Sequence, residues 1–188
     1  GGATFPTQVK LVPPPGSKAE VLIINGVECE PYLTSDHSLM LEKGEEILIG
    51  VTLLMKAANV SKAIIGIENN KPDAIDYLKK LAKEFNGISI EPLKVQYPQG
   101  GEKQLIDAII RKQVKSGALP ISVGAIVQNV GTAFAVYEAI QKNKPLIQRI
   151  QQRQFNVRAH DLERNAGKAR TGAYINNFRI LFNFKRFQ

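Results

Sequence analysis

The chain has 188 residues, of which 44% are hydrophobic and 22% charged, as in a soluble globular protein. No apolar run approaches the roughly 18 residues that a membrane helix needs, and the only cysteine, Cys29, excludes an internal disulfide framework and a cysteine-cluster metal site. The net charge of +8 is uneven, because residues 1–150 hold 17 Lys and Arg against 15 Asp and Glu, whereas residues 151–188 hold 8 against 2.

The first predicted strand follows a loop and a stiff connector. Gly1–Lys10 is expected to be a glycine-led loop, and because it begins without Met we expect a fragment or a processed chain. Pro13-Pro14-Pro15-Gly16 indicates a rigid surface connector. Four apolar residues, Val21–Ile24, then predict a buried strand of a parallel sheet, since both faces of such a strand are covered.

Polar residues end this strand abruptly. Asn25-Gly26 stops the apolar run, and Glu28 and Glu30 follow within a few residues. One interpretation is the carboxyl edge of an α/β sheet, where such folds place ligands. The alternative is an ordinary strand exit with solvated acids.

Strands and helices then alternate along the chain. After a polar loop containing Asp36 and His37, the predicted helices are Glu45–Ala58, Pro72–Phe85, Lys103–Val114 and one that follows Gln128–Thr132 and ends near Ile140; the further strands are Lys62–Ile67, Ile88–Val95 and Gly124–Val127. This order predicts the α/β class: a Rossmann-like, mostly parallel four-stranded sheet with helices on both faces.

Three polar turns are expected to meet at one edge of this sheet. They follow the first strand, the third strand (Tyr97–Glu102) and the fourth strand (Gln128–Thr132). Because the carboxyl ends of parallel strands lie at the same edge, the fold brings together turns that are far apart in sequence.

The turn after the fourth strand is the best candidate for an anion. Asn129 can cap the following helix, and Gly131 lets the backbone approach closely. The amides near Val130–Thr132 would then favour a phosphate by about 0.3–1 kcal/mol through the helix dipole alone, and Lys10 could add a full charge. The alternative is a plain Asn cap and a surface lysine.

The glycines of the second turn do not form a known nucleotide motif. Glu102 follows Gly100-Gly101, so the Lys-Ser/Thr ending of a P-loop is missing, and no Gly-x-Gly-x-x-Gly follows any strand. The pair either lets a flat ligand lie against the backbone or serves a turn that needs positive φ. If Glu28, Glu30 and Glu102 converge, they suit ribose hydroxyls or a ring better than a phosphate.

No residues at catalytic or metal-binding spacing stand out. His37 and His160 have no partner at such spacing and are expected to be solvated. Cys29 has no nearby His or basic residue that would mark it as a nucleophile. We therefore predict no catalytic side chain and no metal site.

Four motifs in this order resemble one family. They are Gly-Gly-Ala-Thr-Phe-Pro-Thr at 1–7, Ile-Asn-Gly-Val-Glu-Cys-Glu-Pro-Tyr at 24–32, Tyr-Pro-Gln-Gly-Gly-Glu-Lys-Gln-Leu at 97–105 and Val-Gln-Asn-Val-Gly-Thr at 127–132. The sequence is similar to the RnfC subunit of the Rnf electron-transport complex, a relative of the NADH-oxidising flavoprotein subunit of respiratory complex I. The resemblance covers residues 1–148, which we expect to form one FMN- and NADH-binding domain.

The resemblance implies that FMN accepts hydride from NADH. The residues implied in FMN binding are Gly1, Gly2, Lys10, Asn25, Glu28, Tyr97, Gly100, Gly101, Glu102, Gln128, Asn129 and Thr132. Of these, the last three would hold the phosphate. Those implied on the NADH side are Phe5, Glu30 and Glu102. The flavin would carry the redox chemistry, and the protein would supply orientation and electrostatics.

Three departures from the family matter. Val27 stands where the complex I relatives tend to have an acid, so the ring contacts are expected to differ. The chain begins inside the glycine loop, so the site is expected to lack its first residues. The iron–sulfur cysteines are absent and are expected further along the full subunit. The implied setting is the cytoplasmic face of a bacterial inner membrane, peripheral, with the other Rnf-type subunits as partners, no transmembrane segment and no nucleic acid.

Residues 149–188 do not resemble the family's continuation. The first 150 residues use 15 Lys and 2 Arg, whereas the last 38 use 2 Lys and 6 Arg. One hypothesis is an altered reading frame or foreign extension, in which case the encoding DNA, shifted by one or two bases, would spell a family-like continuation. The alternative for these residues is a basic segment that contacts RNA, DNA or acidic lipid. For the chain as a whole, the alternative to a flavoprotein is a structural fragment whose fold persists without FMN.

Overall fold

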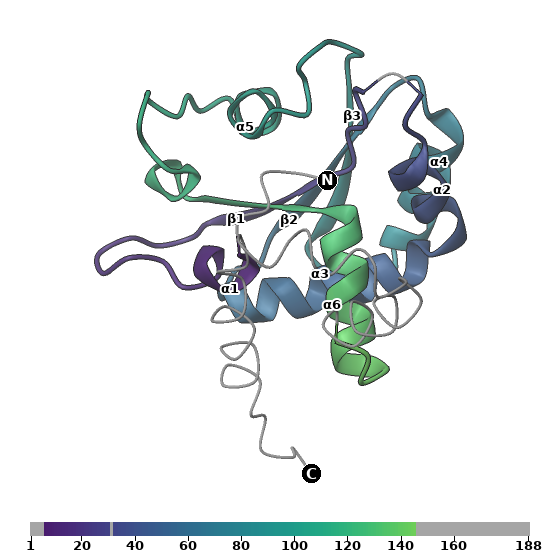
Figure 1. The fold of residues 1–188 in the computed structure, drawn as a ribbon, viewed down its shortest axis with the longest axis horizontal. Helices are drawn as coiled ribbons and strands as arrows, with labels where there is room; N and C mark the ends of the chain where they lie inside the picture. The colour runs from purple at the N-terminus through teal and green to yellow at the C-terminus, as the bar shows by residue number, and fades with distance from the viewer. Residues whose placement is uncertain (1–5, 31, 146–188) are drawn as a thin grey trace, which may run out of the picture.

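The computed structural model describes residues 6–30 and 32–145, and these form one α/β layer structure (Figure 1). The strands are β1 (Val21–Asn25), β2 (Ala63–Glu68), β3 (Ile88–Leu93) and β4 (Ala125–Asn129). The helices are α1 (Thr7–Lys10), α2 (Ser35–Glu42), α3 (Gly44–Ala58), α4 (Pro72–Ala82), α5 (Glu102–Ile110), the 3-10 turn η1 (Pro120–Val123) and α6 (Val130–Gln141). No helix of the described part is long and apolar enough to span a membrane.

The four strands form one parallel sheet in the order β3-β2-β1-β4. The chain therefore advances from β1 to β2 and then to β3. It then crosses back over β2 and β1, and β4 pairs with β1 on the side away from β2. In a doubly wound sheet the strand order reverses at this point, and the crevice outside the carboxyl ends there is where ligands bind. The reversal lies between β1 and β4, where Asn25 is the register partner of Asn129.

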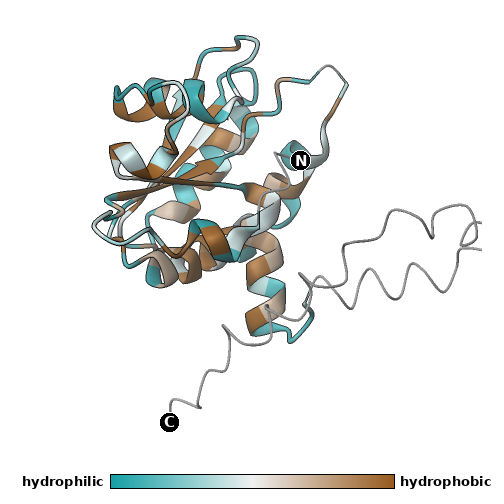
Figure 2. Cartoon of the chain, turned by 60° about the vertical axis from the view of Figure 1, so that its left-hand side comes forward, coloured by the Kyte–Doolittle hydropathy of each residue, from teal (hydrophilic) through white to brown (hydrophobic). Residues whose placement is uncertain are grey.

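The reversal also explains why helices cover both faces. Right-handed crossovers place α3 and α4 on one face while the chain moves one way, and α5 on the other face when it moves back. Leu22 and Ile24 of β1 pack with α3, α4 and α6, whereas Val21 and Ile23 pack toward α5. Figure 2 shows the apolar colour running along the strands and the helices beneath them. The predicted fold class is confirmed.

The predicted helix that is apolar nearly all round is the centre of the larger core. Helix α3 buries eight of its positions: Gly44, Ile47, Leu48, Gly50, Val51, Leu54, Met55 and Ala58. It crosses α6 so closely that a Cβ on Gly50 would lie 2.0 Å from the carbonyl oxygen of Ala133. Only a residue without a side chain fits at this crossing.

Two α-helices of the described part, and the 3-10 turn η1, were not predicted. Residues expected to form a polar loop are the helix α2, and the end of the expected glycine-led loop forms the single turn α1. Helix α2 lacks an amphipathic pattern, and it is held by the burial of Met40 and by a carboxylate from elsewhere in the chain, Glu28, at its first turn. Neither interaction is visible in a local window of sequence.

Several predicted boundaries were too long. The helix expected over Lys103–Val114 ends at Ile110, because Arg111 adopts a left-handed conformation with φ 56°. The helix expected to reach Phe85 ends at Ala82, and the strand expected to reach Val95 ends at Leu93. Each error lengthened an element into the turn that follows it.

Candidate functional site

The predicted meeting of three turns at one sheet edge is confirmed. Asn25 ends β1, and its side-chain amide donates to the carbonyl oxygen of Gly100 at 3.0 Å. Asn129 ends β4, and its side-chain amide donates to the carbonyl oxygen of Asn25 at 3.3 Å. A Cβ on Gly100 would lie 3.3 Å from the sulfur of Cys29, so the turn after β3 lies directly against the loop after β1.

Asn129 caps α6 as the sequence predicted. Its Oδ1 accepts a hydrogen bond from the amide of Gly131 at 2.7 Å. Its Nδ2 also donates to a carboxylate oxygen of Asp36 at 2.7 Å, which ties α2 to the carboxyl edge of the sheet. Thr132 lies in the first turn of α6, where backbone amides have no intrahelical acceptor. The cap is established by the geometry, whereas the anion remains a prediction.

Lys10 and Glu102 meet although 92 residues separate them. The Nζ of Lys10 donates to Glu102 at 2.7 Å and to the carbonyl oxygen of Val127 at 3.1 Å. These contacts join α1, the start of α5 and β4 beside the three turns. Both predicted residues therefore belong to the same edge. Gly101 is the N-cap residue of α5, and Glu102 is the first residue of this helix.

Gln128 carries an unused donor at this edge. Its residue is 6% exposed, and its Nε2 has no hydrogen-bond partner among the described residues. A buried amide donor left without an acceptor costs about 1–3 kcal/mol. An acceptor from a bound ligand would remove that cost, so the chemistry of this residue fits the cofactor contact predicted for it.

Glu28 contacts the backbone of α2. One carboxylate oxygen accepts from the amide of Asp36 at 2.9 Å and from the hydroxyl of Ser35 at 3.1 Å, and the other accepts from the amide of His37 at 3.2 Å. Partial burial raises the pKa of the Glu28 carboxyl, but these hydrogen bonds, together with the charge of Lys71, outweigh it and hold the pKa below its ordinary value.

This arrangement predicts a pH-dependent contribution of Glu28 to stability. Because the folded-state pKa is lowered, the contribution is fully present above the ordinary value of 4.5 and is lost as the pH falls through the folded pKa. Glu28→Gln should lower the free energy of unfolding at pH 7 by about 1 kcal/mol. Urea unfolding at several pH values measures this difference, which should shrink toward zero in acid.

The exposed Glu84, which follows α4, supplies a matched charge change. Glu84→Gln should have little effect at any pH. A Glu28→Gln difference that stays constant into acid would contradict the capping role.

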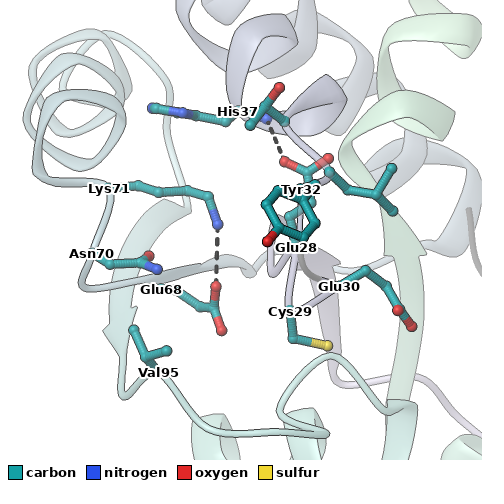
Figure 3. A pocket seen from close by; sticks show the side chains of 11 residues that line it. Glu28, Cys29, Glu30, Tyr32, His37, Glu68, Asn70, Lys71 and Val95 are labelled. Atoms are coloured by element: carbon teal, nitrogen blue, oxygen red, sulfur yellow. Dashed lines mark hydrogen bonds and ion pairs between the residues drawn. The ribbon is translucent and has the colours of Figure 1, made fainter.

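A cavity of about 360 Å³ opens beside Glu28 and holds two residues that the sequence analysis missed. Glu68 ends β2 and Lys71 precedes α4, and their side chains pair at 3.1 Å (Figure 3). Glu28 and Cys29 face this pair across the cavity (Figure 3). The topological argument used for the other three strands also applies to β2 and would have placed Glu68 at this edge.

His37, which was expected to be solvated, lies at the surface but has a partner there. Its Nε2 lies 2.9 Å from a carboxylate oxygen of Asp73, so it joins α2 to the start of α4. The hydrogen bond with His37, followed by that from the amide of Ala74, lowers the pKa of the Asp73 carboxyl. The pair lies at the surface and makes a structural link between helices.

The remaining predicted residues divide into two groups. Tyr97 is 72% exposed, and Glu30 lines the cavity with an exposed side chain, so a ligand can reach both. Gly1, Gly2, Phe5 and His160 lie outside the described residues, as does the whole basic segment 149–188. In the described part, no group of three or more His, Cys, Asp or Glu is arranged to hold a metal ion.

Residues 1–138 match the family model of the Nuo51 FMN-binding domain. The chain belongs to this family. The match spans the four motifs and every strand described above, so the predicted relationship to the complex I flavoprotein is confirmed. The FMN-binding function of the family fits a site that holds an unpaired buried donor at the reversal of strand order.

The sequence relatives are C subunits of ion-translocating complexes, which confirms the predicted resemblance to RnfC. The chain is 52% identical over 150 residues to the C subunit of the proton-translocating ferredoxin:NAD(+) oxidoreductase complex of Clostridium ljungdahlii, and the match covers 80% of the chain and 33% of the relative. It is 48% identical over 149 residues to the C subunit of the Na(+)-translocating ferredoxin:NAD(+) oxidoreductase complex of Acetobacterium woodii, covering 79% and 34%. The chain thus spans about a third of the length of these relatives.

A solved structure shares the fold. The crystal structure of an NAD+-reducing [NiFe]-hydrogenase in the air-oxidized state matches with a TM-score of 0.61 at 24% identity. The match covers 74% of this chain and 27% of the hydrogenase chain. At this level of identity the likeness supports the Rossmann-like fold and carries no residue roles.

Proposed function

We propose that this chain is the flavin-binding part of a C subunit of an Rnf-type complex, and that its FMN accepts hydride from NADH. The observation that carries the proposal is the convergence of the turns after β1, β3 and β4 at the strand-order reversal. Family membership supports FMN as the ligand. The NADH reaction and the passage of electrons to other subunits extend what the names of the relatives say of those proteins.

The residues divide by the part of FMN that they suit. Asn129, Gln128 and Thr132 would hold the phosphate, because α6 begins there and its first amides favour an anion. Asn25 and Gly100 would flank the ring, because the Asn25 side chain donates to the carbonyl oxygen of Gly100 and the absence of a side chain at position 100 lets the loop after β1 pack against this turn. Lys10 would neutralise charge, and Glu102 would turn to the ribityl hydroxyls.

The flavin, when bound, supplies the acceptor for a hydride and a store for two electrons. The chain's part is orientation. The turns at the carboxyl edge of the sheet leave Tyr97 and Glu30 exposed, and an incoming nicotinamide would approach on that exposed side. Phe5 would complete this side, and Gly1 and Gly2 would contact the flavin. We place the iron–sulfur clusters in the remaining two thirds of the subunit. We place the complex at the cytoplasmic face of the membrane. The domain boundary between residues 148 and 149 stays a prediction.

Anaerobic reduction tests the proposal. The purified chain, incubated with FMN and freed of excess, should show flavin absorbance that bleaches when NADH is added. Gln128→Met removes the buried donor and should weaken FMN retention about tenfold, whereas Gln96→Met, at an exposed position, should not. A chain that takes up no FMN would instead be a structural fragment, and retention without bleaching would refute the NADH reaction alone.

A further inference from the structure

The cavity after β2 contains a buried ion pair with an unused acceptor. Glu68 is 1% exposed and Lys71 is 7% exposed, and their side chains pair at 3.1 Å. The second carboxylate oxygen of Glu68 has no hydrogen-bond partner in the described part of the chain. Figure 3 shows it turned away from Lys71 and toward the space beside Cys29. A buried carboxylate oxygen without a donor is costly, so this atom indicates a missing hydrogen-bonding group.

The walls of the cavity come from three strand exits. Glu28 and Cys29 follow β1, Glu68 ends β2 and Lys71 follows it, and Val95 follows β3. Cys29 lies directly against Gly100, the glycine proposed to flank the flavin ring. The cavity therefore adjoins the proposed cofactor site, and its volume of about 360 Å³ lies in the range of small-molecule sites.

Charge restricts what the cavity accepts. Three carboxylates, Glu28, Glu30 and Glu68, face one ammonium, that of Lys71, so a phosphate is disfavoured. The described residues form no metal-binding cluster. The unpaired oxygen of Glu68 needs a ligand group that donates a hydrogen bond. Lys71 has three N–H donors and uses one on Glu68, so it can donate to a carbonyl oxygen beside that group.

We propose that Glu68 and Lys71 together bind an amide edge, in which an N–H donor stands beside a carbonyl acceptor. This inference rests on the proposed function, whose two ligands both carry such an edge: the pyrimidine side of the flavin ring and the carboxamide of the nicotinamide.

Ligand analogues that lack only the N–H donor test the pairing. 3-Methyl-FMN lacks the ring N–H, and the 3-acetylpyridine analogue of NADH lacks the carboxamide N–H. Fluorescence titration of the 188-residue chain should show that one natural ligand binds about 10- to 100-fold more tightly than its analogue. The double variant E68M/K71M should bind that ligand and its analogue alike. The exposed pair Lys112 and Glu20, at the opposite sheet edge, gives the control variant E20M/K112M, which should keep the preference.

The FMN titration and the NADH titration together identify which ligand supplies the amide edge. Loss of the preference for FMN assigns the pair to the flavin, and loss of the preference for NADH assigns it to the nicotinamide. If the double variant keeps the wild-type preference in both titrations, the inference is overturned and the proposed function stands. The same holds if the wild-type chain shows no preference in either titration. A wild-type chain that binds neither natural ligand overturns both. Near-ultraviolet circular dichroism confirms that each variant is folded.

Discussion

Lys71→Met is expected to lower the free energy of unfolding by about 3–5 kcal/mol. The change removes the only charged partner that the described structure gives to the buried carboxylate of Glu68, at 3.1 Å. An unpaired carboxylate in this environment loses the attraction that compensated for its removal from water. Urea unfolding at pH 7 measures the difference.

The double change separates the cost of an unpaired charge from the value of the pair. Replacing both members of a buried ion pair by apolar residues is often neutral or stabilising. We therefore expect E68M/K71M to recover most of the stability that Lys71→Met loses. A double variant no more stable than the single one would show that the lysine stabilises the fold through its packing rather than through its charge.

Gly50→Ala is expected to destabilise the fold by about 3 kcal/mol, at the upper end of overpacking effects. Alanine normally stabilises a helix interior relative to glycine by about 0.5–1 kcal/mol, so the expected sign is reversed. The reason is the crossing of α3 and α6, where the new Cβ would lie 2.0 Å from the carbonyl oxygen of Ala133 and backbone must move. Thermal or urea unfolding gives the value.

An exposed position on the same helix provides the control. Ala57 lies on the solvent side of α3, and Ala57→Gly should cost about 1 kcal/mol through helix propensity alone. If Gly50→Ala is instead stabilising, the two helices are further apart than the structure places them.

The sheet could be predicted from sequence because its strands are short apolar runs with both faces buried. Ile23 and Ile24 pack on opposite faces, so a run without alternation was the correct signal for a parallel strand. The convergence of the turns followed from topology alone. The cap at Asn129 followed from residue type, because Asn is one of the residues preferred at the N-cap of a helix.

What could not be predicted depends on long-range contacts. Helix α2 is held in part by the Glu28 carboxylate, which accepts hydrogen bonds from Ser35, Asp36 and His37, seven to nine positions further along the chain. The pair of Lys10 with Glu102 needs the folded sheet to bring its members together. Glu68 was overlooked because a charged residue that ends an apolar strand resembles a solvated exit, whereas the structure buries it.

The central claim is that three separate turns form one FMN site, and amide NMR of the labelled chain tests it most directly. On addition of FMN, the signals of residues 25–28, 100–102 and 128–132 should shift together with a single affinity. Signals at the opposite sheet edge, such as those of Glu20 and Gly124, should remain in place. Shifts confined to one turn, or centred on the opposite edge, would contradict the account.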